Sequence, residues 1–144
     1  PMAMLPFIGY DAGDYLNHWL SIGKNADSAQ LPRIYYVNWF RRDSDGSFLW
    51  PGFGENSRVL KWIVERLEGR ATASETPIGY VPTPESLDTG GLDMTPEQIK
   101  AALHVSTKEW AAEIPQIQQW FDRFGDTLPP TLLTELDALK DRLG

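Results

Sequence analysis

The sequence contains no cysteine, and it has only two histidines, His18 and His104. Without cysteine the chain cannot form disulfide bonds, thiolate nucleophiles or cysteine-based zinc sites. Two histidines are too few for a histidine-rich metal site, and we expect His18 to lie on the surface. No apolar run approaches the roughly 18 residues that span a bilayer, and the chain does not open on a signal-peptide pattern. We therefore expect a cytoplasmic protein that does not contact a membrane.

Positive charge is in the minority as well: 13 lysines and arginines stand against 20 aspartates and glutamates, which gives a formal net charge of -7 at pH 7. An acidic surface repels polyanions, so we expect no nucleic acid or anionic membrane as a partner. A small anion can still bind through local arginines such as Arg41, Arg42 and Arg58. The 144 residues, 42% of them hydrophobic, predict one compact domain with a real core. Since the first residue is Pro1 and not methionine, we expect a part of a longer polypeptide.

The motifs of common enzyme chemistry are missing too. The chain has no phosphate-binding loop of the form G-x-x-x-x-G-K-[ST], and Gly52-Phe53-Gly54 lacks the third glycine of a dinucleotide fingerprint. No Ser/His/Asp or Cys/His constellation can be assembled. Asp43 and Asp45 do not make a calcium loop, because Gly46 is misplaced and no glutamate follows at the twelfth position. By its own chemistry the chain can hold a ligand but cannot readily transform one.

Large aromatic residues, in contrast, are concentrated in one stretch, residues 38–58, which reads N-W-F-R-R-D-S-D-G-S-F-L-W-P-G-F-G-E-N-S-R. They are Trp39, Phe40, Phe48, Trp50 and Phe53. Glycine, proline and charge punctuate the stretch too densely for a core strand, while a solvated loop carries fewer large rings. Aromatic residues held on turns suit a flat ligand such as a purine, whose face stacks on rings while its edge stays readable. The alternative is a tight hairpin that packs its own rings into a core.

The same region predicts a hairpin followed by a helix. Ile34–Phe40 is expected to be a strand, Asp43–Gly46 the turn and Ser47–Trp50 the return strand. The helix after it has Glu55 or Asn56 as its candidate N-cap. Its apolar face is expected to consist of Leu60, Ile63, Val64 and Leu67.

Helices are expected to form most of the remaining regular structure. Asp11–Ser21 predicts a helix that Gly23 ends, and Thr95–Gln98 and Ser106–Glu109 are typical of capping boxes. Further apolar helix faces are expected at Trp110, Ile114, Ile117, Phe121 and Phe124, with Pro115 kinking or splitting that helix, and at Leu132, Leu136, Leu139 and Leu143. A buried connection is expected over Pro1–Gly9 and a short strand over Thr76–Val81. The predicted fold class is mixed α and β (α/β), helix-rich with a short hairpin.

The motif N-W-F-x(7)-F-L-W-P-G-F-G-E-N-S-R resembles the guanine-binding segment of GTP-dependent phosphoenolpyruvate carboxykinases. The likeness extends to Pro1–Tyr10, which is similar to the stretch after the mobile lid of that family, and to Tyr15–Leu20, Thr76–Val81 and the helical tail. A motif this long is far more specific than an isolated G-x-G. The resemblance implies that residues 1–144 are the C-terminal, guanine-binding portion of a larger enzyme and match about its last quarter.

The resemblance implies an enzyme that converts oxaloacetate and GTP into phosphoenolpyruvate, carbon dioxide and GDP, a lyase of gluconeogenesis. It implies GTP or GDP as the bound nucleotide, manganese at the active site, magnesium with the nucleotide and a monomeric parent enzyme. Phe40 and Phe53 would sandwich the purine, Phe48 would wall the pocket, and Asn56 would read the guanine edge while also capping its helix. Ile8 stands where the family commonly has an aromatic ring, and it is only a weak substrate neighbour.

The resemblance also implies what this chain does not contain. The phosphate-binding loop, metal ligands, reactive cysteine, substrate arginines and lid of the family would all lie before Pro1. We therefore expect no catalytic residue and no metal ligand here, and no activity from this chain alone. Two other classes stay open: a non-catalytic, aromatic-rich binding module for a sugar or peptide, and a helical interaction domain with the face from Trp110 to Phe124 as its partner surface.

Overall fold

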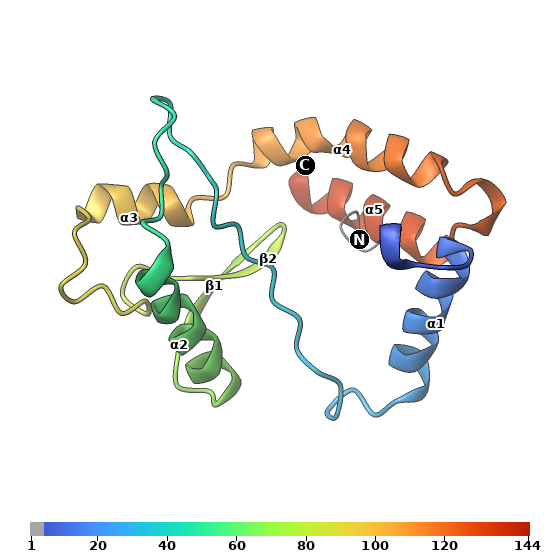
Figure 1. Cartoon of the computed structure of the whole chain (residues 1–144), viewed down its shortest axis with the longest axis horizontal. Coiled ribbons are helices and arrows are strands. Elements are labelled where there is room, and N and C mark those ends of the chain that lie inside the picture. The colour runs from blue at the N-terminus through green and yellow to red at the C-terminus, as the bar shows by residue number, and fades with distance from the viewer. Residues whose placement is uncertain (1–4) are drawn as a thin grey trace. The chain divides into compact units, whose positions relative to one another are not determined.

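Helices form most of the regular structure that the computed structural model shows for residues 5–144, the residues it describes (Figure 1). In chain order they are α1 (Ala12–Asn25), α2 (Asn56–Leu67), α3 (Pro96–Leu103), α4 (Thr107–Asp122) and α5 (Pro130–Leu143). Two strands, β1 (Ala73–Thr76) and β2 (Gly79–Pro82), pair antiparallel, from Ala73 opposite Pro82 to Thr76 opposite Gly79. The mixed α and β class is confirmed, although the regular hairpin lies elsewhere than predicted.

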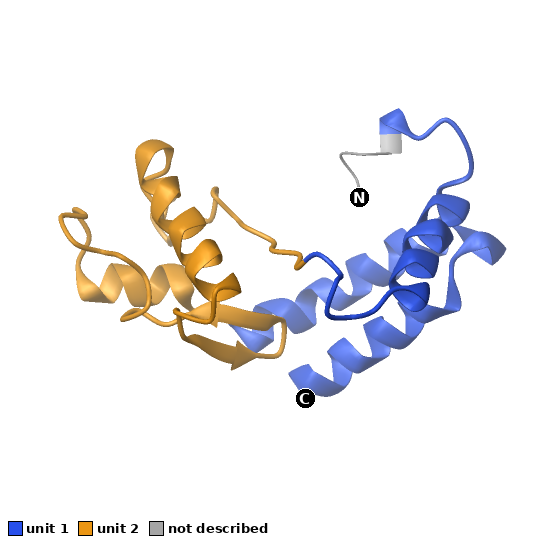
Figure 2. Ribbon diagram, turned by 90° about the horizontal axis from the view of Figure 1, so that it is seen from below, with its two compact units in different colours: residues 1–32, 106–144 blue, residues 33–105 orange. Residues whose placement is uncertain are grey.

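The described residues divide into two compact units where the length predicted one domain (Figure 2). Unit 1 contains the residues up to Pro32 together with Ser106–Gly144, and unit 2 contains Arg33–Val105. Helices α1, α4 and α5 therefore belong to unit 1. The hairpin, α2 and α3 belong to unit 2, as does the whole aromatic segment 38–58.

In unit 1, α1 begins at a side-chain cap and passes close to a neighbouring turn. The Asp11 carboxylate accepts hydrogen bonds from the backbone N–H groups of Gly13, at 2.8 Å, and Asp14, at 3.3 Å. A Cβ atom on Gly13 would lie 2.1 Å from the carbonyl oxygen of Thr127, so this position requires glycine. The predicted end of the helix at Gly23 is wrong, because α1 continues to Asn25. One glycine costs a helix only about 1 kcal/mol and does not by itself end it.

Helices α4 and α5 lie side by side in unit 1 (Figure 1). The predicted apolar residues of α5 are buried at Leu136 and half-buried at Leu132, Leu139 and Leu143, and those of α4 are half-buried. Pro115 lies inside α4 and does not split it, so of the two expected effects the split is absent. Proline removes one backbone hydrogen bond, and the half-buried apolar residues on both sides of it keep the helix in place.

Unit 2 has a small core around two tryptophans. Trp50 and Trp62 are buried together with Ala71 and Leu87, and the Tyr35 ring meets Trp62 edge-on, with the ring centroids 6.1 Å apart. The Trp62 indole donates to the Ser86 hydroxyl at 3.1 Å and to the Thr72 carbonyl at 3.2 Å. Such a large side chain decides which face of α2 turns inward. The predicted apolar face is therefore wrong in part: Ile63 is half-buried, but Leu60, Val64 and Leu67 are exposed.

The predicted strands do not form as expected. Ile34–Phe40 is irregular, with Ile34 and Tyr36 each 92% exposed, and segment 34–50 has a single isolated bridge, between Arg42 and Phe48. Thr76–Val81 contains the end of β1, the hairpin turn and most of β2. The chain turns between the strands at Pro77, which has no N–H to donate to a ladder.

Three smaller expectations have clear outcomes. His18 is exposed, as predicted, and the capping box at Thr95 is confirmed in both of its hydrogen bonds. At Ser106 the structure shows only half a box, in which the Ser106 hydroxyl accepts from the Glu109 N–H. The expected buried connection over Pro1–Gly9 lies outside the described residues at positions 1–4. For the described part of this segment the expectation of burial is wrong, because Phe7 is exposed.

Candidate nucleotide-binding site

A tight turn presents the first half of the aromatic segment. The Asp43 carboxylate accepts hydrogen bonds from the N–H groups of Asp45 and Ser47, both at 2.9 Å. Backbone bonds from Asp43 N–H to Ser47 O and from Leu49 N–H to Arg41 O close the loop. Gly46 has φ 82°, a conformation that glycine adopts without strain. The predicted turn is thus present, although no regular strands flank it.

Phe40 and Phe48 come together at this turn and stay open to solvent. Their ring centroids are 6.2 Å apart with planes at 61°, and the side chains are 74% and 51% exposed. The Arg42 guanidinium lies 4.0 Å from the centroid of the Phe48 ring, within the range of a cation–π contact. The two rings therefore form an exposed aromatic surface. The alternative prediction, a hairpin that packs these rings into a core, does not describe them.

Phe53 is displayed by a strained backbone. It has φ 46°, follows Gly52 at φ 79°, opens the 3₁₀ turn Phe53–Glu55 and is 97% exposed. Positive φ is uncommon for a bulky residue, and such strain is concentrated at functional sites. Within residues 5–144 no aromatic pair includes Phe53. Two rings that clamp a base do not touch each other, so the sandwich of Phe40 and Phe53 stays a prediction.

Asn56 is held by the core of unit 2. Its side-chain oxygen accepts a hydrogen bond from the Trp50 indole at 3.0 Å, and the residue is half-buried. The expectation that Asn56 caps its helix is wrong, because Asn56 is the first residue of α2 and its side-chain oxygen accepts from the Trp50 indole, not from a backbone N–H of the helix. Glu55 occupies the N-cap position, but its side chain makes no capping bond and instead pairs with Arg58. Since Asn56 lies six residues after Trp50, sequence spacing gave no sign of this contact.

The three arginines considered as anion ligands all have partners within unit 2. Arg41 donates to the carbonyl oxygen of His104 at 2.6 Å, and Arg42 donates to that of Gly46. Arg58 pairs with Glu55 and donates to the carbonyl oxygens of Asp88 and Gly90, both at 2.9 Å. Arg58 thereby ties the start of α2 to the loop after Leu87, and its side chain is only 19% exposed.

An ion pair strengthens the same connection. The Lys61 ammonium lies 2.7 Å from the Asp88 carboxylate. The hydrogen bond from Lys61, the backbone N–H of Gly90 and the charge of Lys61 together lower the pKa of Asp88 below its ordinary value of 3.8. The reciprocal hydrogen bond from Lys61 to Asp88 raises the pKa of Lys61 above 10.5. Both groups are exposed to solvent, so the pair orients the loop more than it stabilises the fold.

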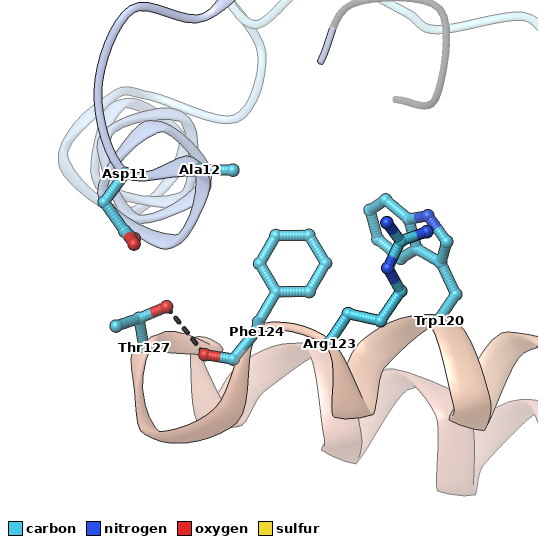
Figure 3. Close-up of a pocket in the computed structure, with 6 residues that line it drawn as sticks. All are labelled: Asp11, Ala12, Trp120, Arg123, Phe124 and Thr127. Atoms are coloured by element: carbon cyan, nitrogen blue, oxygen red, sulfur yellow. Dashed lines mark hydrogen bonds between the residues drawn. The ribbon is translucent and has the colours of Figure 1, made fainter.

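Ile8, which the resemblance suggested as a weak substrate neighbour, belongs to unit 1 and is half-buried. Unit 1 also contains a hollow of about 260 Å³ (Figure 3). It is lined by Asp11, Ala12, Trp120, Arg123, Phe124 and Thr127. The Trp120 and Phe124 rings form one wall, with centroids 4.6 Å apart. None of the candidate base-binding residues lines this hollow. The sequence did not predict it, because Phe124 was assigned to a core face and Trp120 to no face.

Residues 5–144 contain neither a candidate membrane-spanning helix nor a cluster of potential metal ligands. No helix in this range has the length and apolarity that crossing a membrane requires. No three histidine, cysteine, aspartate or glutamate side chains gather at one place in this range to form a metal site.

Comparison with known proteins identifies the family. A family model described as "Phosphoenolpyruvate carboxykinase C-terminal P-loop domain" matches residues 1–142. Proteins named "Phosphoenolpyruvate carboxykinase [GTP]" are 61% identical to the whole chain in Paenarthrobacter aurescens and 62% identical in Renibacterium salmoninarum. One from Neocallimastix frontalis is 53% identical over 99% of the chain. The chain spans about a quarter of their length, 24% in each case. The resemblance seen in segment 38–58 is confirmed, and the chain belongs to the GTP-dependent phosphoenolpyruvate carboxykinase family.

Proposed function

We propose that this chain is the guanine-nucleotide-binding part of a GTP-dependent phosphoenolpyruvate carboxykinase. The observation that carries the proposal is that one segment of unit 2 holds three exposed phenylalanines, Phe40, Phe48 and Phe53. The same segment contains Asn56, whose side chain is hydrogen-bonded to the buried Trp50. Phe40 and Phe53 stack on the two faces of the purine, and Phe48 closes the side of the pocket. Asn56 reads the base edge.

Physical chemistry supports guanine as the base. Exposed rings are unfavourable in water and gain about 1–3 kcal/mol for each base that stacks on them. Guanine offers an acceptor at O6 and donors at N1 and N2, which an amide and nearby backbone groups can match. Adenine reverses the polarity at position 6 and leaves polar partners unpaired, which can cost orders of magnitude in affinity.

The proposed reaction of the complete enzyme has two steps. Oxaloacetate loses carbon dioxide to form an enolate, and the enolate oxygen then takes the γ-phosphoryl group of GTP to give phosphoenolpyruvate and GDP. This chain contributes position, because clamping the base fixes where the γ-phosphate lies relative to the bound acid. Residues 5–144 gather no cluster of metal-ligating side chains, so they do not fit the manganese or magnesium of the reaction.

The remaining parts of the proposal follow from family membership alone. The phosphate-binding loop, the metal ligands and the catalytic side chains belong to the rest of the polypeptide, which is the principal partner of this chain. The complete enzyme is a cytoplasmic monomer that serves gluconeogenesis, and the isolated chain has no carboxykinase activity.

Titration with GDP and ADP tests the proposed function. Trp39 and Trp50 flank the proposed pocket, so GDP should change the tryptophan fluorescence of the chain at millimolar or lower concentration, and ADP should not. Equal responses to both nucleotides would remove the role given to Asn56 and favour an unselective aromatic-binding module. No response to GDP would contradict the proposal that this segment forms a base pocket.

A further inference from the structure

Among residues 5–144, the side chain of Asn56 makes one hydrogen bond, and its partner is Trp50. The indole nitrogen of Trp50 lies 3.0 Å from the side-chain oxygen of Asn56. Trp50 is buried at 9% exposure in the cluster with Trp62, Ala71 and Leu87, whereas Asn56 is half-buried. A core residue of unit 2, Trp50, thus donates a hydrogen bond to Asn56, the residue proposed to select the base.

The chemistry of the two groups fixes the direction of the amide. An indole N–H only donates, so the atom of Asn56 that faces it must be the oxygen and not the nitrogen. Rotating the amide by half a turn would place two donors against each other and leave the indole N–H without an acceptor, which is unfavourable. Of the two amide orientations, the contact with Trp50 permits one.

The contact with Trp50 leaves the amide nitrogen of Asn56 available to a ligand. It has no hydrogen-bond partner among residues 5–144, and no buried side-chain nitrogen or oxygen in that range lacks a partner. The amide nitrogen of Asn56 therefore reaches solvent. It offers N–H donors, which bind an acceptor on a base and repel an amino group.

We propose that Trp50 is the positioning residue for guanine selection, holding Asn56 so that its amide donors meet the O6 acceptor of guanine and oppose the 6-amino group of adenine. This inference rests on the proposed function. The anchor is rigid, because Trp50 belongs to the core and Arg58 ties the start of α2 to the loop at Asp88 and Gly90. Trp50 itself need not touch the nucleotide.

The test compares GDP, IDP and ADP binding by calorimetry in Trp50→Phe, Asn56→Ala and the double variant. Trp50→Phe keeps an aromatic ring and removes the donor, so the preference for GDP over ADP should fall about tenfold or more. Asn56→Ala should cause a similar fall. In the Asn56→Ala background, Trp50→Phe should cause no further loss of preference, because Trp50 acts through Asn56. Trp39→Phe, which removes an indole from the same segment without touching Asn56, is the matched control.

Each outcome decides between the two proposals. A wild-type chain without a GDP preference contradicts the proposed function, and the inference falls with it. If the wild type prefers GDP and Trp50→Phe keeps that preference, the inference is overturned and the proposed function stands. The same holds if Trp50→Phe lowers the preference equally with Asn56 present and with Asn56→Ala.

A second measurement does not depend on the folding of Trp50→Phe. IDP has the O6 of GDP but lacks its 2-amino group, so Asn56→Ala should weaken GDP and IDP binding by the same factor. Weakening of GDP alone would mean that Asn56 reads the 2-amino group through its oxygen and not O6 through its nitrogen, which would overturn the inference. In nuclear magnetic resonance spectra, the Trp50 indole N–H signal should also move in Asn56→Ala; an unmoved signal would overturn the inference.

Discussion

Phe53 combines a strained backbone with a ring that almost nothing in the described chain covers. A residue at φ 46° normally needs glycine or asparagine, and a phenylalanine there costs about 1–3 kcal/mol. A folded protein gains nothing from such a residue when its ring is 97% exposed. A ligand that stacks on the ring would supply the compensating interaction. At the scale of one residue, Phe53 is therefore the strongest single support for the proposed base clamp.

Two glycines of α1 give a matched prediction about stability. Gly13→Ala would place a Cβ atom 2.1 Å from the carbonyl oxygen of Thr127, whereas Gly23→Ala meets nothing within 4 Å. We expect Gly13→Ala to lower the free energy of unfolding by about 1–3 kcal/mol because the helix and the turn must separate. Gly23→Ala should raise it by about 1 kcal/mol, because alanine favours the helix. Urea denaturation followed by circular dichroism measures both, and equal effects would mean that α1 does not approach Thr127 as described.

At the scale of elements, the helices were largely predictable because their signals are local. Thr95 and Gln98 satisfy each other's backbone within one turn, and Pro96 stands where a helix tolerates proline. The apolar spacing from Leu132 to Leu143 likewise needs no knowledge of distant residues. The apolar spacing of α2 did not predict which side of the helix faces inward. That side is set by the large Trp62 side chain and by its hydrogen bonds to Thr72 and Ser86, which lie outside the helix.

The strand over Ile34–Phe40 failed for the opposite reason. Its composition favours a strand, but a strand also needs a partner at a matching register, and composition does not supply one. The chain pairs only at Arg42 and Phe48 and then turns into the 3₁₀ segment at Phe53. Within the candidate site, the family motif predicted which residues contact the base. The contact between Trp50 and Asn56 could not be read from it, because asparagine near a helix start ordinarily predicts a cap.

The ion pair between Lys61 and Asp88 gives a prediction about pH. Because the pKa of Asp88 is lowered in the folded protein, its contribution to stability is present above the ordinary value of 3.8 and is lost as the pH falls through the lower folded value. Because the pKa of Lys61 is raised, its contribution is lost only as the pH rises beyond 10.5. The difference in unfolding free energy between the wild type and Asp88→Asn should thus be constant from about pH 5 to 9 and shrink below pH 3.8.

Urea denaturation across this pH range measures the difference. Asp93→Asn is the control, since Asp93 is exposed and has no ion pair among the described residues. It should change the unfolding free energy less than Asp88→Asn at pH 7. A difference for Asp88→Asn that grows on acidification would show that the carboxylate is not stabilised by Lys61.

At the scale of the whole molecule, the candidate residues are unequally distributed. Phe40, Phe48, Phe53 and Asn56 all lie in unit 2, and Ile8 lies in unit 1. The chain also spans only about a quarter of the length of its relatives. The proposed function places the base clamp in this chain and the chemical centre on another stretch of polypeptide. It therefore predicts that mutations in the clamp separate nucleotide binding from the handling of oxaloacetate.

Phe53→Ala in the complete carboxykinase tests that separation. Removing one stacking ring should weaken nucleotide binding by about 1–3 kcal/mol, so the KM for GTP should rise well above that of the wild type. The KM for oxaloacetate should change much less, because the proposed clamp places Phe53 against the base and not the acid. Tyr36→Ala is the matched control: Tyr36 is another exposed aromatic residue of unit 2, it has no proposed role, and its loss should leave both constants unchanged. Steady-state kinetics with each substrate varied in turn gives both values. If both constants rose by the same factor in Phe53→Ala, the ring would support the fold of the complete enzyme, and the base would have to be clamped elsewhere.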